Sequence, residues 1–130
     1  MIQRQLSFQE AIKIVLTEKY CCFTGRASRS EYWWWVLFTA LIGFVMGFVM
    51  GFVFNANLEA TRVVSWIVNL ALFLPGLGLC MRRLHDIGKS GWWLLIGLIP
   101  VVGLILLIVW FCQPSQPGEN QYGEEPYMIM

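Results

Sequence analysis

Three long stretches of the chain, residues 32–54, 63–81 and 92–112, contain no Asp, Glu, Lys, Arg or His. A helix needs about 20 apolar residues to cross the hydrocarbon core of a membrane. Each Arg, Lys or Asp near its centre costs roughly 2.5–3.5 kcal/mol on insertion scales. The pattern therefore predicts three transmembrane helices, over residues 29–54, 63–81 and 92–112. The alternative is three buried helices of a soluble bundle, but such helices need a polar face toward water, and these segments have none.

Residues 6–20 have a different pattern, in which apolar side chains recur at helical spacing and polar ones lie opposite. Ser7 and Glu10 have the spacing of a capping box, which predicts that a helix begins at this point. Basic residues lie on both sides of the segment. We expect an amphipathic helix that either lies in the headgroup layer or packs against the membrane-spanning helices or a partner.

Composition supports this interpretation and limits the partners. The 130 residues are 58% hydrophobic and 13% charged, whereas a soluble domain has about 25% charged residues. The length allows one membrane domain, residues 1–130. The net charge of +1 gives no global basic field, so we expect no nucleic-acid partner. The predicted fold class is an all-α integral membrane protein, with three transmembrane helices preceded by an amphipathic interfacial helix.

The distribution of Lys and Arg predicts the orientation in the membrane. Eight of the nine basic residues precede the first predicted span or lie between the second and third, and only Arg62 lies between the first and second. The positive-inside rule places the richer side in the cytoplasm. The N-terminus is then cytoplasmic, and residues 113–130, which contain no basic residue, form an extracytoplasmic tail. All seven tryptophans lie near a predicted interface, where their rings are favoured.

Small and polar residues within the spans predict where helices pack. Gly43, Gly47 and Gly51 are four residues apart and share one helix face. Inside lipid, small residues allow two helix backbones to approach closely, so this face is predicted to pack within the chain or between copies. Asn69 is the most polar residue of the spans, and we expect it to hydrogen-bond across helices.

Two prolines predict interruptions of the helices. Pro75 removes the hydrogen bond to the carbonyl group of Ala71, and inside a membrane that carbonyl group must find another partner. Pro100 lies between Gly97 and Gly103, so we expect the third span to bend there.

Polar residues at the ends of the spans predict caps and ion pairs. Ser28 and Glu31 have capping-box spacing, which predicts the start of the first span. Asp86 lies three residues after Arg83 and four after Arg82, so it can pair with either on a helix. We therefore assign capping or ion-pairing roles to Ser28, Glu31 and Asp86.

Several motifs resemble those of one family. GRASRSEYW begins at Gly25, RRLHDIGKSGWW begins at Arg82, a proline lies in the next span, and PGENQYGEEP begins at Pro117. From about residue 23 to residue 126, the chain is similar to domain-of-unknown-function family 805, the YhaH-like small bacterial inner-membrane proteins. The resemblance implies a bacterial inner-membrane protein of a few helices and implies no biochemical activity. Residues 1–20 lie outside the part that matches.

The predicted topology brings two basic motifs to the same cytoplasmic face. Guanidinium groups bind phosphate bidentately, and a basic pocket between helices on this face is the expected form of an anionic-lipid site. We predict a non-enzymatic interaction module that binds anionic phospholipid or an acidic partner, and that can associate with itself or with another membrane protein. The candidate binding residues are Arg26, Arg29, Arg82, Arg83, His85 and Lys89. The alternative is that these residues only set the topology.

Two other functional classes stay open. His85, Asp86 and Ser90 could attack a lipid ester, but adjacent residues on a helix point about 100° apart. The chain also lacks a GxSxG motif, so no catalytic residue is assigned. An oligomeric channel or transporter component is the other class, although the spans carry no ionisable group that could line a path. With one histidine and no CxxC spacing, we expect neither a metal nor a cofactor.

Overall fold

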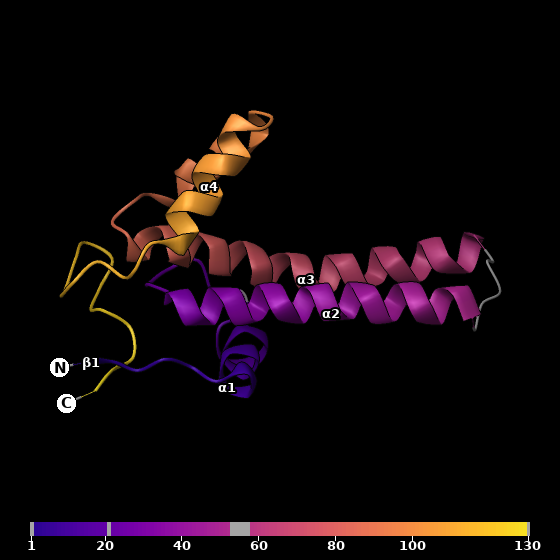
Figure 1. Ribbon diagram of the computed structural model, residues 1–130, viewed down its shortest axis with the longest axis horizontal. Coiled ribbons are helices and arrows are strands. Elements are labelled where there is room, and N and C mark those ends of the chain that lie inside the picture. The colour runs from indigo at the N-terminus through magenta and orange to yellow at the C-terminus, as the bar shows by residue number, and fades with distance from the viewer. Residues whose placement is uncertain (1, 21, 53–57, 130) are drawn as a thin grey trace.

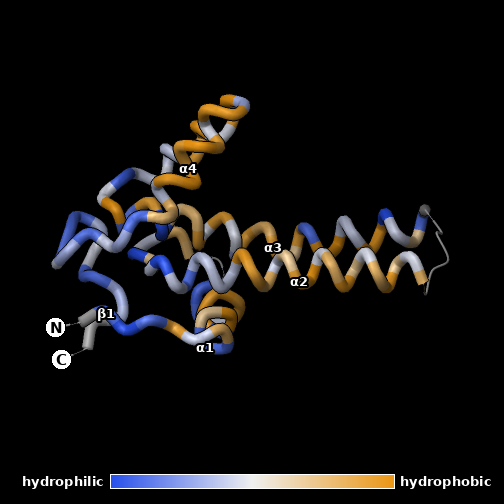
Figure 2. Tube along the Cα trace, viewed as in Figure 1, coloured by the Kyte–Doolittle hydropathy of each residue, from blue (hydrophilic) through white to orange (hydrophobic). Residues whose placement is uncertain are grey.

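The computed structural model describes residues 2–20, 22–52 and 58–129, and most of them are helical (Figure 1). The elements in chain order are β1 (Ile2–Gln3), α1 (Phe8–Lys13), the π-helix η1 (Ile14–Glu18), α2 (Arg29–Phe52), α3 (Leu58–Asp86), the 3₁₀ helix η2 (Gly91–Leu98), α4 (Val102–Cys112) and β2 (Met128–Ile129). Helices α2 and α3 lie side by side along the long axis, and both are long and apolar enough to cross a membrane (Figure 1). Figure 2 shows hydrophilic residues concentrated at the end of the molecule where both termini lie.

The first two predicted spans correspond to α2 and α3. Helix α2 begins at Arg29 as predicted, because the Ser28 hydroxyl accepts a hydrogen bond from the Glu31 N–H (3.3 Å). The predicted end at residue 54 lies outside the described residues. Helix α3 is longer than the predicted 63–81 and continues to Asp86. Its last turn is charged, and it stays helical because those side chains have partners inside the chain.

The predicted amphipathic helix is formed by α1 and η1. The Ser7 hydroxyl accepts a hydrogen bond from the Glu10 N–H (3.3 Å), which confirms the first capping box. Ala11 and Val15 are fully buried. The Phe8 ring lies edge-on to Trp34, with 5.7 Å between the ring centroids. This amphipathic segment therefore packs against α2, which is one of the placements that the sequence predicts.

The prediction of one continuous helix over residues 92–112 is wrong. The segment consists of η2 and α4, two shorter helices that fold back on each other. The turn between them is centred on Val101, whose φ is 67°, and the Val102 N–H donates to the Pro100 carbonyl group (2.7 Å). This is a γ-turn that reverses the chain. Pro100 thus ends one helix instead of bending it.

Glycines at the predicted bend allow the two arms of this hairpin to touch. A Cβ atom at Gly103 would collide with the carbonyl oxygen of Ile96, and one at Gly97 would lie 3.0 Å from the Leu107 side chain. The sequence pattern therefore contains the signals for a hairpin. Hydropathy alone cannot separate a spanning helix from two apolar helices of half the length.

Because this segment turns back, the tail does not lie opposite the N-terminus. Strands β1 and β2 pair antiparallel, with Ile2 opposite Ile129. The Arg4 N–H also donates to the Tyr127 carbonyl group (2.7 Å). The prediction that the N-terminus and residues 113–130 lie on opposite sides is therefore wrong for the described part of the tail. We call the end of the molecule where both termini lie the polar end (Figure 1).

The carbonyl group that Pro75 frees has the partner that a membrane requires. The Tyr20 hydroxyl donates to the Ala71 carbonyl oxygen (2.7 Å). Tyr20 follows η1, so this bond ties the N-terminal segment to the middle of α3. The expectation that Ala71 needs another donor is confirmed.

The predicted packing face of α2 has no partner within the described chain. A Cβ atom built at Gly43, Gly47 or Gly51 would meet no described side chain or neighbouring helix within 4 Å. The Asn69 side chain makes no hydrogen bond to any described residue, and Asn69 lines a groove of about 320 Å³ with Thr39 and Gly43. The described residues therefore show neither the within-chain packing nor the Asn69 bond. Packing between copies stays a prediction.

Candidate functional site

Five buried charged residues meet where α2 begins and α3 ends. We call them the buried polar cluster, and they are Arg26, Glu31, Arg82, Arg83 and Asp86. Their side chains are at most 1% exposed. Burying a charge is unfavourable unless it is paired and hydrogen-bonded, so the partners of each group decide what the cluster can do.

Asp86 forms ion pairs with two arginines. Its carboxylate accepts from Arg26 Nε at 3.0 Å and from Arg83 Nη1 at 2.8 Å. The Ser115 hydroxyl, from the tail, donates to the same carboxylate. The predicted pairing of Asp86 with the arginine three residues before it is confirmed, and the other two partners come from distant parts of the chain.

Glu31 forms the second centre of the cluster. Arg82 Nη1 donates to its carboxylate at 2.8 Å, and the Tyr127 hydroxyl donates to the other carboxylate oxygen at 2.9 Å. Burial raises the pKa of Tyr127, and the neighbouring Glu31 charge raises it further. The phenol therefore stays protonated and keeps donating to Glu31.

The Arg26 guanidinium binds the tail as well as Asp86. Its Nη1 donates to the carbonyl groups of Gly118 (2.7 Å) and Gly123 (3.2 Å). Its Nη2 donates to those of Gln116 (2.6 Å) and Asp86 (3.1 Å). One side chain thus holds two separate turns of the tail against the end of α3.

The C-terminal end of α4 is capped by basic and aromatic side chains. The last carbonyl groups of a helix have no partner within the helix. Arg83 Nη2 donates to those of Phe111 (3.1 Å) and Gln113. Trp33 Nε1 also donates to Phe111 (3.2 Å), and Arg29 Nη1 donates to Cys112 (3.1 Å). These bonds fix the returning arm of the hairpin at the polar end.

His85 and Lys89 contact aromatic rings. The imidazole of His85 stacks on Tyr122 with 4.0 Å between centroids, and its Nδ1 lies 2.9 Å from the Gly25 carbonyl oxygen. The Lys89 ammonium lies 4.7 Å from the Trp110 ring centroid and 5.6 Å from that of Trp93. Both are cation–π distances.

The structure divides the six predicted binding residues into two groups. Arg26, Arg82, Arg83 and His85 come together and are buried. Arg29 is exposed and Lys89 is half-buried, and both lie at the end of α4. The guanidinium groups of the first group face acceptors of the chain itself, although Arg82 Nη2 and Arg83 Nε have no partner among the described residues.

Residues of the tail were missed by reasoning from the sequence. Ser115 and Tyr127 supply donors to the buried carboxylates, and Tyr122 covers His85. The sequence prediction places them on the opposite side of the membrane, because it treats residues 92–112 as a complete span. The signal that could have found them was Pro100 between two glycines, which permits a reversal of the chain.

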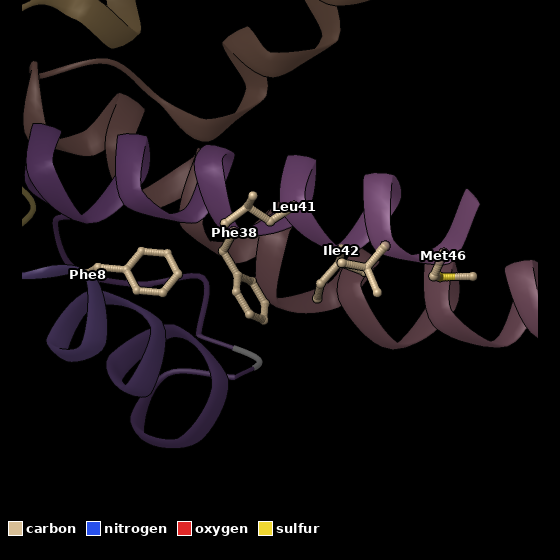
Figure 3. Close-up of a pocket in the computed structure, with 6 residues that line it drawn as sticks. Phe8, Phe38, Leu41, Ile42 and Met46 are labelled. Carbon is tan, nitrogen blue, oxygen red and sulfur yellow. The ribbon is translucent and has the colours of Figure 1, made fainter. Parts of the chain in front are cut away.

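The structure also contains an apolar groove of about 330 Å³ that is separate from the cluster. It lies between α1 and α2, and Figure 3 shows Phe8 close to Phe38, with Ile42 and Met46 farther along α2. Its lining offers neither a charged nor a polar side chain. Among the described residues, no group of three His, Cys, Asp or Glu side chains could hold a metal ion.

Comparison with known proteins places the motifs of this site in one family. Residues 20–124 match the family described as "Protein of unknown function (DUF805)". The chain belongs to this family. The family match includes all five residues of the buried polar cluster and the first turns of the tail that Arg26 holds.

Curated relatives of the family come from Escherichia coli. The inner membrane protein YhaH of strain K12 is 37% identical over 109 residues, which are 84% of this chain and 90% of YhaH. The inner membrane protein YhaI of the same strain is 38% identical over 109 residues, which are 84% of this chain and 89% of YhaI. No solved structure matches the chain significantly. With its apolar helices, the chain is accordingly a helical membrane protein.

Proposed function

We propose that this protein is a non-enzymatic inner-membrane protein whose polar end faces the cytoplasm and binds anionic phospholipid headgroups through Arg29 and Lys89. The cytoplasmic placement of the polar end follows from the positive-inside rule. Eight of the nine basic residues belong to the polar end, and the ninth, Arg62, lies near the opposite end of α3. Acidic residues of the tail have little influence on this rule.

The observation that carries the proposal is the division of the basic residues. Arg26, Arg82 and Arg83 are occupied by carboxylates and carbonyl groups. The Arg29 guanidinium is exposed and has one acceptor among the described residues, the Cys112 carbonyl group. Its remaining N–H groups are free to bind a phosphate. The proposed lipid site therefore contains two of the six residues predicted from the sequence, Arg29 and Lys89.

The tryptophans around these two residues support a position at the lipid headgroups. Trp33 follows Arg29 by one helical turn, and Trp93 and Trp110 lie beneath the Lys89 ammonium. Tryptophan and basic side chains are both favoured at the membrane interface, where the ring reaches apolar chains and the charge reaches phosphate.

A non-enzymatic role agrees with how the candidate catalytic groups are used. The Ser90 hydroxyl accepts from the Trp92 N–H at the start of η2 (3.3 Å). His85 is held between Tyr122 and the Gly25 carbonyl group. Both groups therefore have structural partners, and this favours a binding role over ester hydrolysis.

Native mass spectrometry of the protein in mild detergent tests this proposal. Each basic residue near an anionic surface contributes about 1 kcal/mol. The Arg29→Gln, Lys89→Gln protein is therefore expected to retain phosphatidylglycerol or cardiolipin about 30-fold more weakly. Arg62→Gln is the control, because it removes one positive charge at the far end of α3 and should leave retention unchanged. Equal retention by all three proteins would contradict the proposal.

A further inference from the structure

We propose that residues 91–112 form a re-entrant hairpin, which inserts among the acyl chains of the leaflet next to the polar end and returns to the same side. The partner of its apolar surface is thus the hydrocarbon of one leaflet. This inference does not depend on which lipid headgroup is bound.

The lengths of the two arms fit half of a bilayer. Helix α4 has 11 residues, which at 1.5 Å per residue is about 16 Å. Helix η2 has 8 residues, which at 2.0 Å per residue in a 3₁₀ helix is also about 16 Å. The hydrocarbon core is about 30 Å thick, so neither arm is long enough to cross it.

The surface of the hairpin requires an apolar environment. Residues 92–112 contain no Asp, Glu, Lys, Arg or His, and Leu98 and Val101 at the tip are 80% and 68% exposed. A contiguous apolar surface of this kind is rare on a protein in water. Figure 2 shows that α4 is coloured hydrophobic, as are most of the residues along α2 and α3. Acyl chains that surround the spanning helices therefore surround the hairpin as well.

The base of the hairpin has the chemistry of a membrane interface. Trp93 and Trp110 lie near its two ends, with their rings edge-on and 5.8 Å between the ring centroids, and the Lys89 ammonium lies over both. The bonds from Arg29, Trp33 and the buried polar cluster to the last carbonyl groups of α4 keep the returning end at this level. The hairpin thus enters and leaves at the polar end.

The turn at the tip can lie in hydrocarbon because most of its backbone donors are paired, the Val101 N–H being one without an acceptor among the described residues. An unpaired N–H in lipid costs several kcal/mol. Pro100 has no N–H, and the Val102 N–H donates to its carbonyl group within the turn. The N–H groups of Ile99 and Gly103 donate to Ile96 (3.0 Å) and Ile99 (3.1 Å). The non-helical residues therefore expose little hydrogen-bonding capacity to lipid.

Labelling with a membrane-impermeant maleimide tests the topology. Single cysteines would be placed at Gln5, Arg62 and Glu119 in a chain whose own cysteines are changed to serine. Gln5→Cys and Glu119→Cys are expected to react in membrane vesicles of the same orientation, and Arg62→Cys only in the opposite orientation. Reaction of Glu119→Cys together with Arg62→Cys would overturn the proposal. If the cysteine-free chain does not fold, a topology reporter fused after residue 130 of the unaltered chain shows on which side of the membrane the tail lies. A reporter on the side opposite the N-terminus would overturn the proposal.

A spin label at Val101→Cys then measures the depth of the tip. We expect the label within the hydrocarbon of the leaflet next to the polar end, shielded from water-soluble relaxation agents on both sides. A label at the far interface would show a spanning segment and overturn the proposal. Efficient disulfide formation between two Val101→Cys chains would also overturn it, because a second copy and not lipid would then cover the tip.

Discussion

The polar end and the far halves of α2 and α3 differ in what their side chains contact. At the polar end, charged groups from α3, α2 and the segment just before α2 are buried against one another and against hydroxyl groups of the tail. In the far halves, large apolar side chains such as Phe44 (75% exposed) and Trp66 (63% exposed) point outward, and the glycine face of α2 is open. The chain therefore determines the structure of the polar end by its own contacts, whereas the far halves depend on the bilayer. Substitutions should show this contrast.

The largest expected effect is that of Asp86→Asn. The change removes the charge that pairs with Arg26 and Arg83, and leaving a buried charge unpaired costs about 3–5 kcal/mol. We expect a lower free energy of unfolding by that amount in detergent, with Glu124→Gln, an exposed position on the tail, as the control. A loss below about 1 kcal/mol would mean that the cluster does not stabilise the polar end.

The next effect depends on pH and on Tyr127. Its hydrogen bond to Glu31 is to a charged acceptor and contributes about 1.5–3 kcal/mol. Because folding raises the pKa of Tyr127 above its ordinary value of 10.0, this stability is complete below pH 10 and is lost as the pH rises further. Tyr127→Phe should lower stability at pH 7 and remove part of the alkaline decrease. Identical curves for the two proteins between pH 7 and 11 would contradict this assignment.

A smaller effect is expected where the N-terminal segment meets α3. Tyr20→Phe removes the donor to the Ala71 carbonyl group and should cost about 1 kcal/mol. In Pro75→Ala the helix itself supplies an N–H to Ala71, so the same Tyr20 substitution should then cost much less. Equal costs of Tyr20→Phe in the two backgrounds would show that the hydroxyl does not serve the freed carbonyl group.

The smallest effect is expected at the open glycine face. A Cβ atom at Gly47 would meet no described side chain within 4 Å, and Gly47→Leu replaces glycine by a better helix former, so no stability should be lost. Copies that pack across this face would be separated by the larger side chain, and cross-linked dimers should decrease. A loss of more than about 1 kcal/mol in the free energy of unfolding would instead indicate packing within the chain.

The local features of the fold could be predicted because they depend on neighbouring residues. The caps at Ser7 and Ser28, the start of α2 and the pairing of Asp86 with Arg83 all follow from spacing along a helix. The need of the Ala71 carbonyl group for a partner follows from Pro75 alone. The donor, Tyr20, is 51 residues away in sequence and could not be identified.

The arrangement of the polar end could not be predicted, because it depends on one turn. Hydropathy treats residues 92–112 as a span whether or not Pro100 reverses the chain. A prediction that treats these residues as a span puts the tail on the opposite side of the membrane from the buried polar cluster. The arginines of the cluster then have no acceptors from the tail. This error explains why the sequence predicts lipid phosphate as the partner of Arg26. In the structure, the acceptors of Arg26 include three carbonyl groups of the tail.

The most direct test of the buried polar cluster is a double-mutant cycle on Glu31 and Arg82, which are 2.8 Å apart and come from different helices. Free energies of unfolding would be measured in detergent for Glu31→Gln, Arg82→Met and the double variant. If the guanidinium serves the carboxylate, each single change leaves a buried polar group unpaired, and the coupling energy should be about 1.5–3 kcal/mol. Additive effects, with a coupling energy below about 0.5 kcal/mol, would contradict the structural role of the arginines.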